Sequence, residues 1–258
     1  MPPDYFSNTG QLWGNPIYDH EKMRHNDFHW WVARIAFALK LYDIVRIDHF
    51  RGFCGVWEVP GGDKTAENGE WATVPGNEIF TAVQKSLGKL PVIAEDLGDI
   101  TQDVRELRDR FGFPGMKILQ YAFGGDAANE FLPHNLTQNT VVYTGTHDNE
   151  TAVGWWRSRS GNAFANERRF CRNYLGTDMR EPNWALIRAA ISSVSDLAII
   201  PMQDALGLGN EARMNTPATD SGNWTWRMNE RAFTPDIERR LRNLTATYGR
   251  LHLIHNLG

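Results

Sequence analysis

Short apolar runs that alternate with helical patterns constrain the fold of this 258-residue chain most. The runs cover 43–47, 91–94, 116–121, 140–144 and 197–200, and each is followed by polar or turn-forming residues. Runs of this length and composition predict buried strands. Strands that alternate with helices predict an α/β fold with a parallel sheet and crossover helices. In an α/β barrel, the carboxyl ends of such strands form the active site.

Helical patterns fill most of the remaining chain. They cover 26–41, 77–87, 101–111, 151–174, 184–194 and 234–248. Residues 1–20, 53–76 and 207–223 follow neither period and predict loops, which are often functional when they are long. The first of these is unusually rich in aromatic and hydrogen-bonding residues, so we interpret it as a binding loop rather than a disordered tail. Its notable residues are Asp4, Tyr5, Phe6, Gln11, Trp13 and Asn15.

Composition narrows the class of protein. The net charge of −4 gives no indication of a nucleic-acid partner. Two cysteines, Cys54 and Cys171, form neither a disulfide framework nor a metal-ligand pattern. No apolar run approaches the roughly 20 residues that span a bilayer, and no secretory signal is apparent. We therefore expect a cytoplasmic protein, or a stromal one if the source is a plant. Ten tryptophans suit either a core or the stacking of sugar rings.

Three carboxylates each follow a predicted strand, namely Asp48, Glu95 and Asp148. Residues two apart on a strand point the same way, so Arg46 should lie beside Asp48 and keep it ionised, as a nucleophile must be. The alternative for Asp48 is a solvated turn. Glu95 follows an apolar run and suits a general acid with a raised pKa. Such a pair exchanges glycosidic bonds, at about 5–5.5 Å separation in retaining enzymes.

Other interpretations of these residues stay open from the sequence. Three carboxylates with His49 and His147 could bind a divalent metal, although the arginine and the tryptophans favour a sugar cleft. The two histidines are either core residues or hydrogen-bonding partners of a sugar hydroxyl, and we favour the latter. Asp96 is interpreted as a turn or cap residue. No phosphate-binding glycine loop or serine or cysteine nucleophile motif is present, and we expect no metal and no cofactor.

Several motifs, in this order, resemble those of the 4-α-glucanotransferases, also called amylomaltases or disproportionating enzymes, of glycoside hydrolase family 77. They are PPDYFS at 2–7, TGQLWGNP at 9–16, RIDHFRG at 46–52, IAEDLG at 93–98, GTHDN at 145–149, EARMNT at 211–216 and GNW at 222–224. The resemblance covers essentially the whole chain. It implies an α-retaining transfer of a 1,4-α-glucan segment to an acceptor glucan or glucose, through a covalent glycosyl-aspartate.

The resemblance also implies roles for nine residues. Asp48 would be the nucleophile, Glu95 the acid/base and Asp148 the stabiliser of the transition state. The implied sugar contacts are Arg46, His49, His147, Gln11, Trp13 and Asn215. The nearest alternatives are an α-amylase-type hydrolase and an inactive glucan-binding fragment.

The implied fold is a (β/α)8 barrel, but five predicted strands do not close one. Residues 1–258 therefore resemble the carboxyl-terminal portion of a single catalytic barrel domain. The family's amino-terminal strands would be the missing partner, and we expect the isolated chain to be unstable or inactive, because open sheet edges invite aggregation.

Overall fold

The computed structural model describes residues 1–3 and 7–251, so the predicted binding residues Asp4, Tyr5 and Phe6 lie outside the described part. The chain divides into two compact units, Met1–Met116 and Lys117–Gly258, and each is described by itself. The boundary falls inside a strand, β5 (Gly115–Ile118). Both units are α/β, as the alternating pattern predicts.

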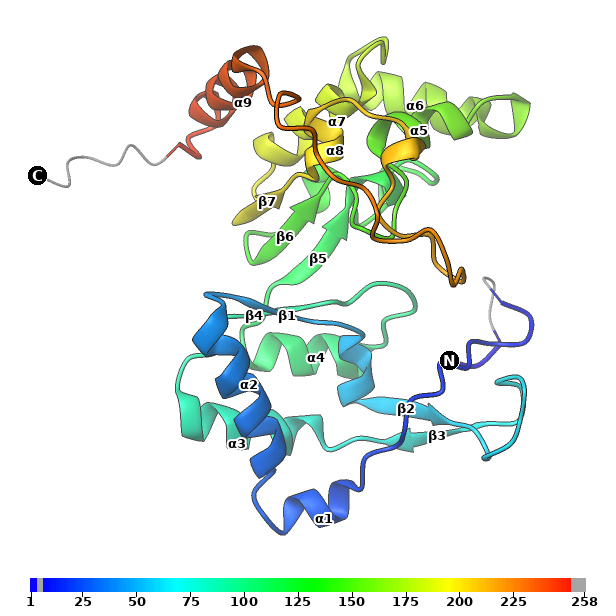
Figure 1. Ribbon diagram of the computed structural model, residues 1–258, viewed down its shortest axis with the longest axis vertical. Helices are drawn as coiled ribbons and strands as arrows, with labels where there is room; N and C mark the ends of the chain where they lie inside the picture. Colours follow the sequence, from blue (N-terminus) through cyan, green and yellow to red (C-terminus); the bar gives the residue numbers. More distant parts are fainter. Residues whose placement is uncertain (4–6, 252–258) are drawn as a thin grey trace, which may run out of the picture. The chain divides into compact units, whose positions relative to one another are not determined.

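The first unit is built on two parallel strands with helices packed against them (Figure 1). In chain order its elements are α1 (His20–Arg24), α2 (His29–Leu41), β1 (Val45–Ile47), the 3₁₀ helix η1 (Phe50–Phe53), β2 (Gly55–Glu58), β3 (Glu70–Thr73), α3 (Gly76–Leu87), β4 (Val92–Ala94) and α4 (Gln102–Arg110). The strands β1 and β4 pair in parallel with Arg46 opposite Ile93. This register brings the carboxyl ends of both strands to the same edge.

Buried aromatic rings hold the helices of this unit to the strand pair. Phe80 of α3 stacks on Phe50 with centroids 5.6 Å apart and meets Phe53 at 4.7 Å and Phe113 at 5.2 Å. Rings offset or edge-on in this way gain about 0.5–1.5 kcal/mol per pair beyond their buried area. Because Phe50 and Phe53 follow β1 directly, this core also fixes the chain just after Asp48.

The stretch 53–76, which the sequence predicts to be a loop, contains the antiparallel hairpin of β2 and β3. Trp57 faces Trp71 across the hairpin at 5.4 Å, and the Arg51 guanidinium lies 4.2 Å from the Trp71 ring. The strands are four residues each, and glycine-rich residues separate them. Cross-strand aromatic pairing therefore stabilises strands that are too short to show an alternating pattern.

The second unit is built on the sheet β5–β6–β7, in which β6 and β7 are parallel with Val142 opposite Ala198 (Figure 1). In chain order, the elements after β5 are η2 (Leu119–Tyr121), η3 (Pro133–Asn135), β6 (Thr140–Tyr143), α5 (Ala152–Ser158), η4 (Asn162–Phe164), α6 (Ala165–Leu175), α7 (Pro182–Ser192), β7 (Leu197–Ile199), α8 (Met202–Ala205), η5 (Asn210–Ala212) and α9 (Pro235–Thr247). Trp155 of α5 and Leu186 of α7 are buried in its core.

One boundary differs from the sequence prediction, because the strand expected over 116–121 ends at Ile118 and is followed by η2. The helical segments expected over 151–174 are the helices α5 and α6, with Gly161 at a φ of 96° and η4 between them. Within 1–3 and 7–251, no helix is both long and apolar enough to cross a membrane. Cys54 and Cys171 are free thiols.

Candidate active site

The ends of β1 and β4 are tied together by backbone hydrogen bonds. Glu95 N–H donates to Ile47 O at 2.9 Å, and Phe50 N–H donates to Glu95 O at 3.0 Å. These bonds extend the parallel pairing past the last strand residues. Asp48 and Glu95 therefore lie on neighbouring segments at one edge of the strand pair, where the sequence predicted them.

The Glu95 carboxylate is half-buried and accepts two backbone hydrogen bonds. His49 N–H donates to one oxygen at 2.7 Å, and Leu97 N–H donates to the other at 2.8 Å. Burial raises the pKa of Glu95 more than these bonds lower it, and the nearby Asp48 charge raises it further. The predicted direction of this shift is confirmed, and a raised pKa is what a general acid needs near neutral pH.

Asp48 differs from Glu95 in being open to solvent. Its side chain is 77% exposed, and one oxygen lies 2.8 Å from the Arg46 guanidinium, which confirms that the two side chains share a face. Arg46 is itself held, because its Nε donates to Met116 Sδ at 3.2 Å. An accessible carboxylate beside a fixed cation can approach an electrophilic carbon, as a nucleophile must.

The segment 11–18 and the residues after β1 enclose a pocket of about 300 Å³. Gln11, Trp13, Asp48 and His49 line it. The Trp13 ring meets the His49 ring edge-on with centroids 4.9 Å apart, and Trp13 Nε1 donates to Gln11 Oε1 at 3.2 Å. Burial, assisted by the Arg51 charge, lowers the pKa of His49, so its ring favours the neutral form that can donate or accept a hydrogen bond.

In the second unit, the polar stretch after β6 places Asp148 in a hydrogen-bonded cluster. Asn215 Nδ2 donates to one carboxylate oxygen of Asp148 at 2.5 Å, and His147 Nε2 lies 3.3 Å from the other. Asn215 N–H also donates to His147 O at 3.0 Å. The sequence predicted all three residues as site residues, and the structure brings them together.

Two further residues support this cluster that the sequence interpretation did not single out. Arg213 donates from Nη2 to Asp148 O at 2.6 Å and from Nε to Asn215 O at 2.8 Å. The Trp224 ring lies 5.2 Å from the His147 ring. Both residues lie inside motifs that show the family resemblance, so the motifs could have marked them as site residues. The spacing of the motifs, however, does not show which side chains Arg213 and Trp224 contact.

The predicted site residues thus form two groups, one in each unit. The first holds Gln11, Trp13, Arg46, Asp48, His49 and Glu95, and the second holds His147, Asp148 and Asn215. Throughout the described ranges, no three His, Cys, Asp or Glu side chains gather in a way that could hold a metal ion.

The site combines a half-buried carboxyl of raised pKa with an exposed carboxylate, and both lie at the carboxyl ends of parallel strands near exposed aromatic rings. Glycoside hydrolases, and transferases that share their chemistry, use such a pair of carboxyl groups. The sequence model of one such family, described as 4-alpha-glucanotransferase, matches residues 1–233. The chain belongs to this family, glycoside hydrolase family 77.

Curated relatives agree with this assignment. The chain is 53% identical over 253 residues to the 4-alpha-glucanotransferase of Synechocystis, with 97% of this chain and 49% of that protein covered. It is 51% identical over 254 residues to a chloroplastic/amyloplastic 4-alpha-glucanotransferase of Arabidopsis thaliana, with 97% and 44% covered. The chain therefore spans about half the length of the curated relatives that it matches.

Solved structures give the same result. An amylomaltase from Streptococcus agalactiae in complex with acarbose superposes with a TM-score of 0.92 at 40% identity, covering 98% of this chain and 50% of that one. An amylomaltase from Corynebacterium glutamicum superposes with a TM-score of 0.77 at 17% identity, covering 95% and 41%, which shows a shared fold alone.

Proposed function

We propose that this chain is the carboxyl-terminal portion of a retaining 4-α-glucanotransferase. The enzyme would cleave a 1,4-α-glucan and transfer the segment to the 4-hydroxyl of an acceptor glucan or glucose. The observation that carries the proposal is the pairing of a half-buried Glu95, whose pKa is raised, with an exposed Asp48 that contacts Arg46, on adjacent strand ends. Retaining enzymes divide their two roles between such a pair of carboxyl groups.

In the first step, a proton moves from the Glu95 carboxyl to the glycosidic oxygen as Asp48 attacks the anomeric carbon. The bond to the leaving sugar breaks, and a glycosyl-aspartate forms. In the second step, the Glu95 carboxylate takes the proton of the acceptor hydroxyl, whose oxygen displaces Asp48. His49 N–H and Leu97 N–H fix the position of the Glu95 carboxyl through both steps.

The remaining predicted residues would bind the sugars. Asp148 would accept hydrogen bonds from hydroxyl groups of the distorted donor sugar, with Asn215 and His147 holding its carboxylate in place. Arg46 and His49 would line the donor position, and His147 would also bind a hydroxyl group of the donor. Transfer prevails over hydrolysis when an acceptor, rather than water, reaches the intermediate, and the exposed Trp13 with Gln11 would favour the acceptor by stacking and hydrogen bonding.

We further propose that residues 1–258 form the carboxyl-terminal part of one (β/α)8 catalytic barrel domain and require the family's amino-terminal half as partner. The high structural overlap with half of the Streptococcus agalactiae amylomaltase supports this. The exposed apolar side chains of α2, which include Phe37 and Leu41, fit a face that another part of the barrel covers. The Arabidopsis thaliana relative is named chloroplastic/amyloplastic and the Synechocystis relative is bacterial, so a cytoplasmic or stromal location suits the proposed use of starch, glycogen or maltodextrin.

The test is a product ladder from maltotriose. The chain is incubated alone and together with the amino-terminal half of the Synechocystis relative, as wild type and as Asp48→Asn, Glu95→Gln and Asp43→Asn. Asp43 precedes β1 and is exposed, so its variant makes the same change in charge at the opposite end of the strand.

We expect glucose together with chains longer than maltotriose in the mixture and with Asp43→Asn. Asp48→Asn should lower transfer by about a thousandfold or more, as loss of a nucleophile does. Products that are all shorter than maltotriose would replace the proposal with an α-amylase-type hydrolase. Binding of maltotriose without any product in the mixture would identify a glucan-binding fragment.

A further inference from the structure

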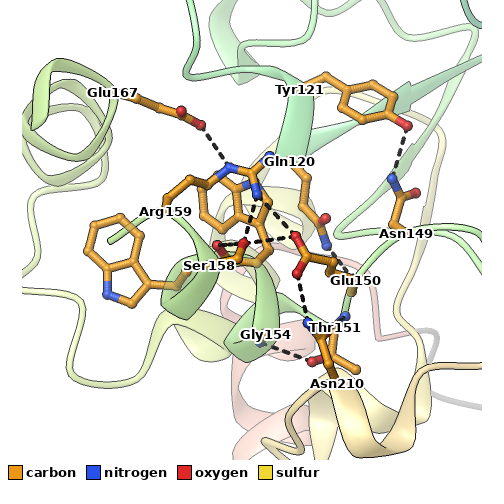
Figure 2. Close-up of polar contacts among 12 residues, drawn as sticks. Gln120, Tyr121, Asn149, Glu150, Thr151, Gly154, Ser158, Arg159, Glu167 and Asn210 are labelled. Atoms are coloured by element: carbon orange, nitrogen blue, oxygen red, sulfur yellow. Dashed lines mark hydrogen bonds and ion pairs between the residues drawn. The ribbon is translucent and has the colours of Figure 1, made fainter. Parts of the chain in front are cut away.

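Glu150 lies two residues beyond Asp148 in the sequence, and its carboxylate contacts the side chains of Asn210, Ser158 and Arg159 (Figure 2). One oxygen accepts from Asn210 Nδ2 at 2.7 Å. The other accepts from Ser158 Oγ at 2.9 Å and lies 3.1 Å from Arg159 Nη1. With three donors on a largely buried carboxylate, Glu150 is fixed far more firmly than a surface glutamate.

Asn210 continues this network in the opposite direction. Its side-chain oxygen accepts from Thr151 N–H at 3.3 Å, while its nitrogen donates to Glu150. The position of Gly154 admits this contact, because a Cβ there would overlap the Asn210 side chain. Asn210 is therefore wedged between the Glu150 carboxylate and the first turn of α5, as Figure 2 shows.

The same two chain segments meet again at Asp148. Asn210 begins η5, and the chain then reaches Arg213 and Asn215, which donate to Asp148 O and to an Asp148 carboxylate oxygen. The segments 147–151 and 210–215 are thus joined on one side by Asp148 and on the other by Glu150. Asp148 and Glu150 lie two positions apart on the first segment, and on the second segment Asn210 lies three positions from Arg213 and five from Asn215. We therefore expect a shift at one junction to move the other.

We propose that Glu150 is a positioning residue, which sets the orientation of Asp148 by holding Asn210 and through it the segment that carries Asn215. This inference rests on the proposed function of Asp148. In this role Glu150 acts through Asn210 and not by contact with the sugar. It determines how well the Asn215 side-chain amide keeps its hydrogen bond to the Asp148 carboxylate, and so how well that carboxylate is oriented toward the transition state.

The test is a polarity swap at the Glu150–Asn210 contact. In Glu150→Gln, the new amide nitrogen either faces the Asn210 nitrogen, which is also a donor, or faces Arg159, which then loses its acceptor. Asn210→Asp places two carboxylates in contact. The double variant restores the pairing, because the Gln amide donates to the new Asp while the Gln oxygen still faces Arg159. Thr151 N–H keeps its acceptor in every case. Glu181→Gln is the matched control, since Glu181 is bonded to Arg240 elsewhere in the same unit.

The first readout needs no activity and uses the 258-residue chain. The measured proton is the backbone N–H of Asn215, which donates to His147 O. Its hydrogen exchange should be about tenfold faster or more in each single variant. In the double variant and in the control it should be within about twofold of wild type. Exchange that is unchanged in both single variants would overturn the proposal. Exchange that is equally fast in the double variant would do so as well, because the contact would not be its cause.

The second readout is transfer by the chain mixed with the amino-terminal half of the Synechocystis relative. Each single variant should lose about tenfold in kcat with KM within about twofold, and the double variant should recover most of it. A role in folding alone would lower the melting temperature and leave kcat per folded molecule unchanged. If the wild-type mixture makes no product, the proposed function fails, and the exchange experiment still decides the role of Glu150.

Discussion

The ion pair between Asp96 and Arg108 allows a sharp prediction about stability. The Asp96 carboxylate is only 2% exposed, and the Arg108 guanidinium lies 2.5 Å from one of its oxygens. Its other oxygen accepts from Met116 N–H at 2.7 Å, which ties the end of β4 to β5. Removal of Arg108 therefore leaves a buried charge without its cation.

We expect Arg108→Ala to lower the free energy of unfolding by about 3–5 kcal/mol, the usual penalty for breaking a buried pair on one side. Asp96→Asn in the same chain should recover most of that loss. The asparagine oxygen can still accept from Met116 N–H, and no charge remains to be desolvated. Arg110→Ala, at an exposed position on the same helix, should change the free energy by less than about 0.5 kcal/mol.

Urea unfolding followed by far-ultraviolet circular dichroism measures these differences. With a slope of about 1–3 kcal/mol per molar urea, the midpoint of Arg108→Ala should fall by at least about 1 M. The reasoning fails if the double variant is as unstable as Arg108→Ala. That result would mean that the packing of the arginine stem, rather than the stranded carboxylate, carries the stabilisation.

Two further predictions follow from buried contacts of the second unit. Burial raises the pKa of Asp204 above its ordinary value of 3.8 although Ala152 N–H and Thr144 Oγ donate to it, so its contribution to stability is present below that value and is lost as pH rises through the folded-state pKa. We therefore compare the free energy of unfolding of wild type with that of Asp204→Asn, and expect the difference, wild type minus variant, to fall as pH rises from about 4 towards neutral. Urea midpoints across that range measure the difference. A difference that rises with pH would contradict the assignment. Gly154→Ala should lower the thermal midpoint and the free energy of unfolding by about 1–3 kcal/mol, because the new methyl group overlaps the Asn210 side chain. Gly124→Ala is the control, since the space around its Cβ is open and its midpoint should not fall. Equal midpoints for the two variants would show that Asn210 moves aside freely.

The fold class and the first carboxylate pair could be read from local pattern. Period-two alternation placed Arg46 beside Asp48, and the apolar run before Glu95 indicated its burial and raised pKa. Both follow from residues close in sequence, where strand geometry is nearly fixed. The β2–β3 hairpin was missed because its strands are short and its stability comes from the Trp57–Trp71 pair across it.

Long-range contacts set the limit of such inference. Asp96 was interpreted as a turn or cap residue, yet it pairs with Arg108 and accepts from Met116 N–H. Likewise, Arg213 supports Asp148 from 65 residues away, and no periodicity relates the two positions. The roles assigned to the site residues therefore stay predictions until the variants above are measured.

The backbone of His49 adds a requirement that its ring does not reveal. Its φ of 49° is left-handed, and in this conformation its N–H donates to Glu95 at 2.7 Å. Glycine, asparagine and aspartate tolerate that region, whereas β-branched residues do not. In a library randomised at this codon and selected for folding alone, valine, isoleucine and threonine should be depleted and glycine and asparagine retained. A second selection, for catalysis, would then show which of the retained residues also replace the imidazole ring. The two selections together separate the requirement for a left-handed backbone from the requirement for the histidine side chain.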